Sequence, residues 1–128
     1  MFLLNVKASY DAAHFLRNYR GKCERLHGHH YVVEAGLAFD DVGPGGMAYD
    51  FTDAKRHLRA IAEQLDHRNL NELEPFREVE TSAENQARWI FEELRARLGA
   101  EHGESLVYVR VWETPNQWAQ YSLRPTWL

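Results

Sequence analysis

The chain has 128 residues, of which 45% are hydrophobic and 27% are charged, and its formal net charge is −4. This length suits one domain spanning residues 1–128, and the composition is that of an ordinary globular protein. The negative charge, together with the lack of any run rich in lysine and arginine, argues against a nucleic-acid binder held by phosphate contacts.

The N-terminal segment lacks the features of an exported or membrane-anchored protein. Met1–Lys7 alternates in polarity and has no basic start, apolar run or small-residue cleavage site of a signal peptide. No apolar stretch approaches the roughly 20 residues that a membrane helix needs. We therefore expect a cytoplasmic protein whose single cysteine, Cys23, remains a free thiol.

The first part of the chain predicts two strands. Residues 2–10 alternate in polarity, as a half-buried strand does, and the same parity continues through Ala12 to His14. A second alternating segment covers residues 31–39 and ends at the glycine-rich turn of residues 40–46. A hairpin-like pairing of the two segments is expected.

Two amphipathic helices are expected next. We expect Met47–Phe51 to extend the hairpin and a helix to begin at Asp50 or Thr52 and run to Leu65, because apolar residues recur there at helical spacing.

The second helix is predicted over residues 83–98. Thr81 and Glu84 have the spacing of a capping box at its start, and Gly99 is placed to cap its end.

The last part of the chain predicts two more strands, at residues 106–113 and 118–123. Val107, Val109, Val111 and Glu113 share one parity in the first of them. The order ββ–αα–ββ predicts an α+β domain, with antiparallel strands and both helices on one side of the sheet.

Three of the seven histidines suggest a metal site. His27 and His29 point to the same face if the second strand begins there, and pairing with the first strand brings His14 beside them. Three imidazoles on one face are typical of a catalytic zinc site, in which the fourth position stays open. A structural site would close that position, and Cys23 is available to do so. We assign no role to His30, His57 and His102.

Cys23 precedes His27 by four residues and admits several interpretations. In a polar loop beside a cationic site its thiol would become a usable base or nucleophile. The alternatives are a fourth zinc ligand or an inert small residue, and the spacing alone does not choose among them.

Two carboxylates also stand out. Asp66 and His67 follow the first helix and would form a proton-transfer pair on an irregular turn, although a histidine that favours the helix dipole is the simpler interpretation. Glu113 ends a face that should be buried, where a carboxylate needs a partner. A flat ligand with two parallel N–H donors would suit Glu113, and the alternative is a strand-end side chain turned into solvent.

These residues together resemble the 6-pyruvoyltetrahydropterin synthase superfamily, and most closely its 6-carboxytetrahydropterin synthase branch. The resemblance covers nearly the whole chain. The matching segments are Asp11-Ala12-Ala13-His14, Cys23-x-x-x-His27-Gly28-His29, Asp50-Phe51, Leu65-Asp66-His67-x-x-Leu70-Asn71, Ser82-x-Glu84-Asn85 and Glu113-Thr114.

The resemblance implies a role for each matching residue. Zinc would be held by His14, His27 and His29. Cys23 would be the catalytic thiol, assisted in proton transfer by Asp66 and His67. The pterin ring would bind Glu113, with Ser82 nearby at a position where the family often has threonine.

The resemblance also implies an assembly and a reaction. The fold would be the tunnelling fold, whose sheets close into an oligomeric barrel, commonly a homohexamer built as a pair of trimers with sites between subunits. The substrate would be 7,8-dihydroneopterin triphosphate. The products of the carboxy branch are 6-carboxytetrahydropterin, acetaldehyde and triphosphate, and the pterin product feeds deazapurine and queuosine biosynthesis.

Two alternatives remain open on the sequence. The short spacing between Cys23 and His27 favours the carboxy branch, whereas a 6-pyruvoyltetrahydropterin synthase would use the same site to eliminate triphosphate only. The chain departs from the carboxy branch at Phe15, where that branch often has an arginine that could make a polar contact. The other alternative is a non-catalytic module that binds zinc or a pterin and uses Cys23 as a ligand.

Overall fold

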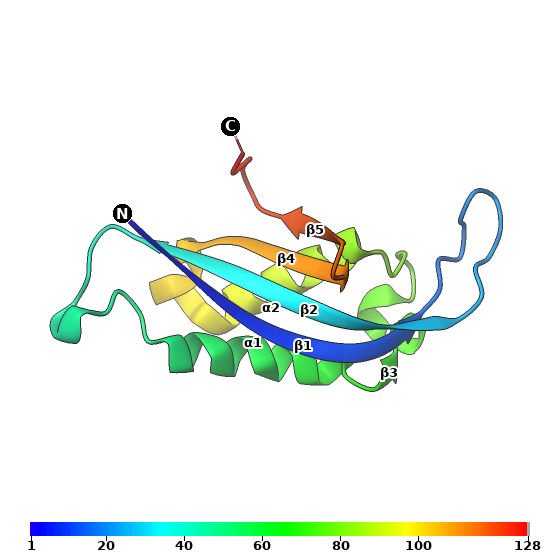
Figure 1. Ribbon diagram of the computed structural model, residues 1–128, viewed down its shortest axis with the longest axis horizontal. Helices are drawn as coiled ribbons and strands as arrows, with labels where there is room; N and C mark the ends of the chain where they lie inside the picture. Colours follow the sequence, from blue (N-terminus) through cyan, green and yellow to red (C-terminus); the bar gives the residue numbers. More distant parts are fainter. Residues whose placement is uncertain (128) are drawn as a thin grey trace.

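The computed structural model describes residues 1–127 as a five-stranded sheet with two long helices against one face (Figure 1). The sheet has the order β3-β1-β2-β4-β5. The principal elements are β1 (Phe2–His14), β2 (His27–Phe39), α1 (Phe51–Leu65), β3 (Arg68–Asn69), α2 (Ala83–His102), β4 (Leu106–Thr114) and β5 (Gln117–Tyr121). The predicted α+β class is confirmed. No helix in residues 1–127 is long and apolar enough to cross a membrane.

β1 and β2 form the long antiparallel hairpin that the alternation predicted. Their pairing runs without a slip from Phe2 opposite Phe39 to His14 opposite His27. β1 therefore does extend to His14, and β2 begins at His27, the condition for its two histidines to share a face. The connection between these strands projects from the end of the sheet near β3 (Figure 1).

The prediction of a wholly antiparallel sheet is wrong, because the sheet also contains one parallel pair of strands. β3 has only two residues and pairs in parallel with β1, with Arg68 opposite Ala12. The chain reaches this position because His67 has a left-handed φ of 56° and its backbone N–H donates to the Asp11 carbonyl at 2.6 Å. A short edge strand of this kind needs few residues and no hydrophobic pattern.

The prediction that Met47–Phe51 extends the hairpin is wrong. A short 3-10 turn at Pro44–Gly46 redirects the chain, with positive φ at Gly45 and Gly46 that only glycine adopts readily. α1 begins after Asp50, whose carboxylate accepts a hydrogen bond from the Thr52 N–H at 2.8 Å. A capped helix start replaces the expected strand.

The predicted capping box of α2 is also wrong. Its N-cap is Ser82, whose Oγ accepts from the Asn85 N–H at 3.2 Å, whereas Thr81 is fully buried outside the helix. Gly99, predicted as the C-cap, has a left-handed φ of 75°, and the chain continues as a short further turn to His102.

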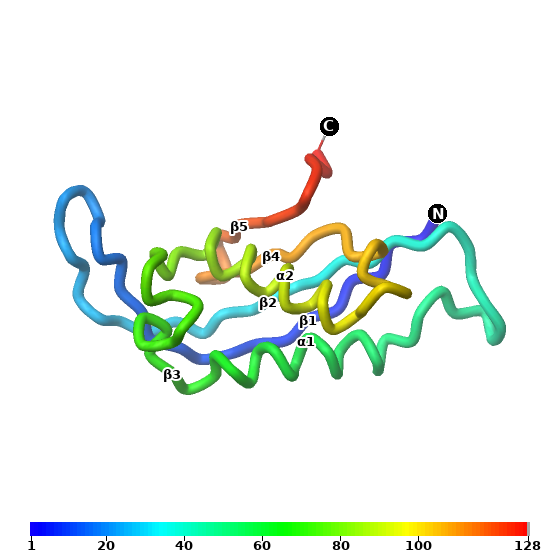
Figure 2. Tube along the Cα trace, turned by 180° about the vertical axis from the view of Figure 1, so that it is seen from behind, coloured from blue at the N-terminus to red at the C-terminus, as the bar shows by residue number. Residues whose placement is uncertain are grey.

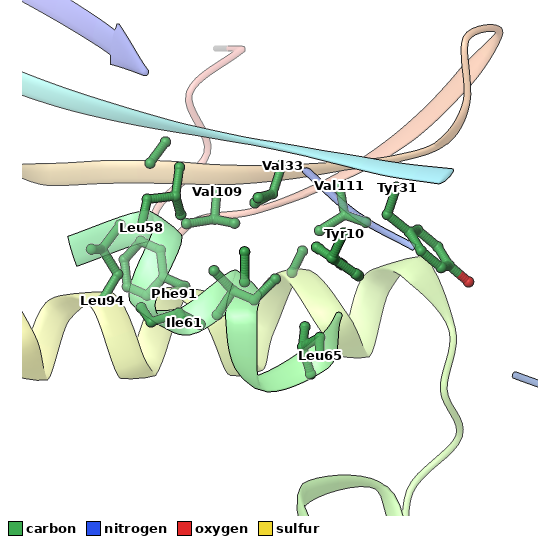
Figure 3. Close-up of a cluster of buried hydrophobic side chains, with 14 of the residues drawn as sticks. Tyr10, Tyr31, Val33, Leu58, Ile61, Leu65, Phe91, Leu94, Val109 and Val111 are labelled. Carbon is green, nitrogen blue, oxygen red and sulfur yellow. The ribbon is translucent and has the colours of Figure 1, made fainter. Parts of the chain in front are cut away.

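The core lies between the helices and one face of the sheet (Figures 2 and 3). Val109 and Val111 of β4 point into it as predicted, but Val107 is only half-buried. A register shift opposite Gly36 and Leu37 places Leu106 in the core instead. At the other end of the sheet the rings of Tyr10 and Tyr31 stack at 5.0 Å and form the floor beneath the histidines.

Candidate active site

Three histidines meet at the end of the β1–β2 hairpin. His14 lies opposite His27 in the register, and His29 lies two residues further along β2 on the same face. Ring centroids are 4.7 Å apart for His14 and His27, 5.0 Å for His27 and His29, and 5.5 Å for His14 and His29. One nitrogen from each ring lies within 4.8 Å of the other two. The sequence prediction that these residues converge is confirmed.

His14 is the most constrained of the three. It is buried, and its Nδ1 donates to the Thr81 carbonyl at 2.8 Å. Burial lowers the pKa of His14, against the opposing effect of the Thr81 hydrogen bond, so the ring is neutral near pH 7. Its other nitrogen, Nε2, is buried and has no hydrogen-bond partner within residues 1–127. A neutral imidazole with one nitrogen bonded and the other free is prepared to ligate a metal.

The donor set fits a zinc ion. Neutral imidazole nitrogens are preferred zinc ligands, and three of them leave a coordination position for water or substrate. The unpartnered Nε2 of His14 is what such an ion would satisfy, because a buried polar atom without a partner is otherwise unfavourable. These residues therefore form a candidate metal centre.

Cys23 does not join this cluster within the described part of the chain. It is an exposed free thiol in the β1–β2 connection, and its Sγ lies 3.6 Å from the Glu24 carbonyl. The geometry of the single chain thus gives no closed site of three histidines and one cysteine.

Glu113 approaches the cluster from β4. Its Oε1 lies 3.8 Å from Nε2 of His29 and accepts a hydrogen bond from the Gln117 side chain at 3.3 Å. The carboxylate is half-buried, with 26% of its side chain exposed, and therefore lies between the buried and the solvated position considered from the sequence. It borders a largely apolar pocket of about 490 Å³ lined by Lys7, Gly28, His29, His30, Val32, Trp112, Glu113, Thr114 and Pro115.

Asp66 and His67 lie on the irregular turn after α1, as their pairing required. Asp66 Oδ1 accepts from the Asp11 N–H at 2.8 Å, and Oδ2 lies 3.5 Å from His67 Nε2. The imidazole is strongly exposed and lines a shallow depression that also contains His29 and His30. The turn groups the pair with Asp11, in a cluster separate from that of the three histidines, and leaves the His67 ring open to solvent.

A second histidine–carboxylate contact lies in the same depression and was missed from the sequence. His30 Nδ1 is 2.7 Å from Asp11 Oδ1, and both side chains are more than half exposed. The available signal was the strand alternation, which puts His30 on the opposite face from His29 and level with Asp11 on β1.

Ser82, expected near the pterin, caps α2 with its hydroxyl. The adjacent Thr81 contacts the histidine cluster instead, because its carbonyl accepts a hydrogen bond from His14. Gln86 donates to the same carbonyl. Sequence reasoning missed both residues. The position of Gln86, four residues before the core residue Ile90, was the signal that a polar side chain lies on the buried face of α2.

The comparisons with known proteins agree with this geometry. Residues 3–124 match the family described as 6-pyruvoyl tetrahydropterin synthase. The 6-carboxy-5,6,7,8-tetrahydropterin synthase of Haemophilus influenzae is 32% identical, over 94% of this chain and 99% of that protein. The Synechocystis protein of the same name is 36% identical, over 94% and 93% of the two chains.

A solved structure supports the same fold. The 6-pyruvoyl tetrahydropterin synthase of Caenorhabditis elegans superposes with a TM-score of 0.85, at 28% identity and 96% coverage of both chains. The expected fold is thereby confirmed.

Proposed function

The chain belongs to the 6-pyruvoyl tetrahydropterin synthase family, and we propose that it is a zinc-dependent 6-carboxy-5,6,7,8-tetrahydropterin synthase. It would convert 7,8-dihydroneopterin triphosphate to 6-carboxytetrahydropterin, acetaldehyde and triphosphate, as a carbon–carbon lyase of queuosine and deazapurine biosynthesis in the cytoplasm. The observation that carries the proposal is the cluster of His14, His27 and His29 with the free Nε2 of His14. The curated relatives of that name support the carboxy product.

The residues of the chain divide the work by position. Zinc, when bound by the three histidines, would lower the pKa of a coordinated substrate hydroxyl. Glu113, one residue from the end of β4 and beside His29, would accept N–H bonds from the edge of the pterin ring. The apolar pocket next to it has room for a flat ring.

Proton transfer would fall to Cys23 and His67. Cys23 is exposed, as a thiol that meets substrate must be. His67 presents its imidazole to solvent, and Asp66 beside it would hold the ring and raise its basicity. The backbone N–H of Asp11 holds the carboxylate of Asp66 in place.

We propose that these parts come together in a homo-oligomer, with a homohexamer of two trimers as the expected form. The sheet ends on one side at the two-residue β3 and on the other at the short β5. β3 covers only Ala12 and Ala13 of β1, so among the described residues the rest of that edge of β1 has no strand partner. An open strand edge of this kind is a template for pairing with another copy. In such a barrel, Asp66 and His67 of one chain would serve Cys23 of its neighbour. Ser82, whose hydroxyl caps α2, would contribute to the pterin pocket only from the margin.

The test is a product assay. Purified protein loaded with zinc is incubated with 7,8-dihydroneopterin triphosphate, and acetaldehyde and the pterin products are quantified. We expect acetaldehyde and 6-carboxytetrahydropterin in equal amounts, and neither after the metal has been removed with a chelator. Triphosphate release without acetaldehyde would reject the carboxy assignment.

The second candidate is a 6-pyruvoyltetrahydropterin synthase. The high structural similarity to the Caenorhabditis elegans protein of that name favours it, and the same site would then only eliminate triphosphate. In the same assay this activity yields the pyruvoyl product and no acetaldehyde, so one experiment separates the two candidates.

A further inference from the structure

A chain of hydrogen bonds runs through the core to the metal centre. The Tyr10 hydroxyl donates to Gln86 Oε1 at 2.7 Å, and Gln86 Nε2 donates to the Thr81 carbonyl at 2.9 Å. The same carbonyl accepts from His14 Nδ1 at 2.8 Å. All four residues are at least 98% buried. Polar groups within an apolar core thus connect β1 to Gln86 of α2, 76 residues from Tyr10, and to Thr81, 67 residues from His14.

The Thr81 carbonyl depends on these side chains for its orientation. Thr81 precedes the N-cap Ser82, so its carbonyl takes no part in the backbone ladder of α2. The two lone pairs of this oxygen are filled by His14 and Gln86. The Thr81 hydroxyl anchors the residue separately, because it donates to the Phe15 carbonyl at 3.1 Å. Removing Gln86 would leave the carbonyl with His14 as its one hydrogen-bond donor among the described residues, so the direction of the carbonyl would be less constrained.

The orientation of Gln86 is itself determined. An amide can be placed with its oxygen and nitrogen exchanged, but the Thr81 carbonyl can only accept and therefore requires the NH₂ group. The Tyr10 hydroxyl, which can donate or accept, then donates to Oε1 and holds that end of the amide. Gln86 therefore presents its NH₂ group to Thr81 in a single arrangement. If the side chain at position 86 only filled the core beside Tyr10, it would need no polar atoms. An apolar side chain there would avoid the free-energy cost of removing an amide from water.

We propose that Gln86 is a positioning residue for the metal ligand His14, acting through the Thr81 carbonyl and oriented by Tyr10. This relay, the hydrogen-bonded series from Tyr10 through Gln86 and Thr81 to His14, holds the Nδ1–H of His14 toward Thr81. Nε2 is then the nitrogen available to the metal. This role of Gln86 rests on the zinc centre of the proposed function. It adds a residue that affects metal affinity without being a metal ligand.

The experiment compares zinc affinity in three variants. Gln86→Leu removes both polar ends of the relay at similar volume. Tyr10→Phe combined with Gln86→Leu removes them together with the hydroxyl that the single change leaves unpaired, and it decides the question if the single variant does not fold. Ile90→Val is the matched control, because Ile90 lies one turn further along α2, fully buried, and is no part of the relay.

Zinc dissociation constants are measured by competition with a chromophoric chelator, and the d–d spectrum of the cobalt-substituted proteins is recorded. We expect roughly tenfold weaker zinc binding and an altered cobalt spectrum in both Gln86 variants, as is typical when a partner beyond the ligands is lost. Ile90→Val should match the wild type in both measurements.

Two results would overturn the relay. One is unchanged zinc affinity and cobalt spectrum in the Gln86 variants. The other is an equal loss of affinity in Ile90→Val, which would mean that any loosening of the core weakens the site. A wild-type chain that binds no zinc would instead contradict the metal centre of the proposed function, so the two failures are distinguishable.

Discussion

Two polar clusters lie on the same strand, β2, and they differ in whether the protein completes them. At its start, His27 and His29 join His14 on the face toward the helices. Five residues after His29, Glu34 is buried on the opposite face of the sheet.

Both carboxylate oxygens of Glu34 contact other side chains of the protein. Trp112 Nε1 donates to its Oε2 at 3.0 Å, Arg110 lies 3.3 Å from the same oxygen, and Lys7 lies 3.3 Å from Oε1. Burial acts to raise the pKa of Glu34, but the hydrogen bonds from Trp112 and Lys7 and the charge of Arg110 outweigh it, so the pKa is lowered.

The histidine cluster is the opposite case. Among the described residues the buried Nε2 of His14 has no hydrogen-bond partner. The Tyr31 ring lies next to the cluster, with its centroid 5.5 Å from that of His29. A polar cluster that satisfies itself stabilises the fold, whereas one with free lone pairs is prepared for a ligand. The difference is therefore one of completeness: protein partners satisfy the Glu34 carboxylate, whereas His14 keeps a nitrogen for the proposed metal.

The largest expected effect comes from removing one metal ligand. His29→Asn should abolish stoichiometric zinc binding and all product formation, because two imidazoles do not hold the ion as three do. Zinc at 100 times its dissociation constant should stabilise the wild type by about 2.7 kcal/mol and leave the variant unaffected. Metal analysis and thermal unfolding with and without zinc measure both. A variant that retains one zinc per chain would contradict the proposal that the three histidines hold the metal.

Cys23→Ala tests whether Cys23 acts in catalysis or as a zinc ligand. We expect turnover to fall by at least about 100-fold, as for loss of a proton-transfer group, with zinc content unchanged because Cys23 stands outside the histidine cluster. Metal content and steady-state kinetics are measured on the same preparation. Loss of zinc would instead support the non-catalytic module in which Cys23 closes the site.

Glu113→Gln separates substrate binding from metal binding. We expect roughly tenfold weaker binding of the pterin substrate, because a charged acceptor of two N–H groups becomes a neutral one. Zinc content should not change. Gln117→Ala is the control, since Gln117 contacts Glu113 without belonging to the proposed site. Substrate affinity equal to that of the wild type, measured by equilibrium binding to the zinc-loaded protein, would refute the anchor.

Glu34→Gln tests the structural end of the comparison. Loss of the charge should lower the free energy of unfolding by about 1.5–3 kcal/mol at neutral pH and leave zinc affinity unchanged. Because the folded pKa of Glu34 is lowered, its contribution is present above the ordinary glutamate pKa and is lost as the pH falls through the folded value. Denaturant unfolding at several pH values should show the gap between wild type and variant closing in acid.

The smallest effect is expected from Lys7→Met, the matched control for Glu34. Lys7 is 63% exposed, so its ion pair with Glu34 is screened, and the change in stability should stay below about 1 kcal/mol. If Glu34→Gln proves equally mild, or if it reduces zinc binding, the two clusters are not independent and the comparison fails.

Local pattern alone was enough to predict much of the fold and the convergence of three histidines. Alternation along residues 2–14 placed His14 on the buried face of β1, and the His27–Gly28–His29 spacing put two more imidazoles on one face of β2. These features depend only on the period of a strand, so the sequence determined them. The helix at residues 51–65 followed in the same way from its apolar spacing.

Tertiary structure decided what depends on contacts between distant segments. Thr81 looked like a helix cap, yet its carbonyl bonds to His14, 67 residues away. β3 exists because His67 turns the chain back onto Asp11, and Val107 leaves the core because of a register shift against β2. The partners of Glu34 likewise come from β1 and β4, and the free nitrogen of His14 also depends on which segments surround it. Periodicity reports which face a side chain occupies, and only the packed chain decides which partners it meets there.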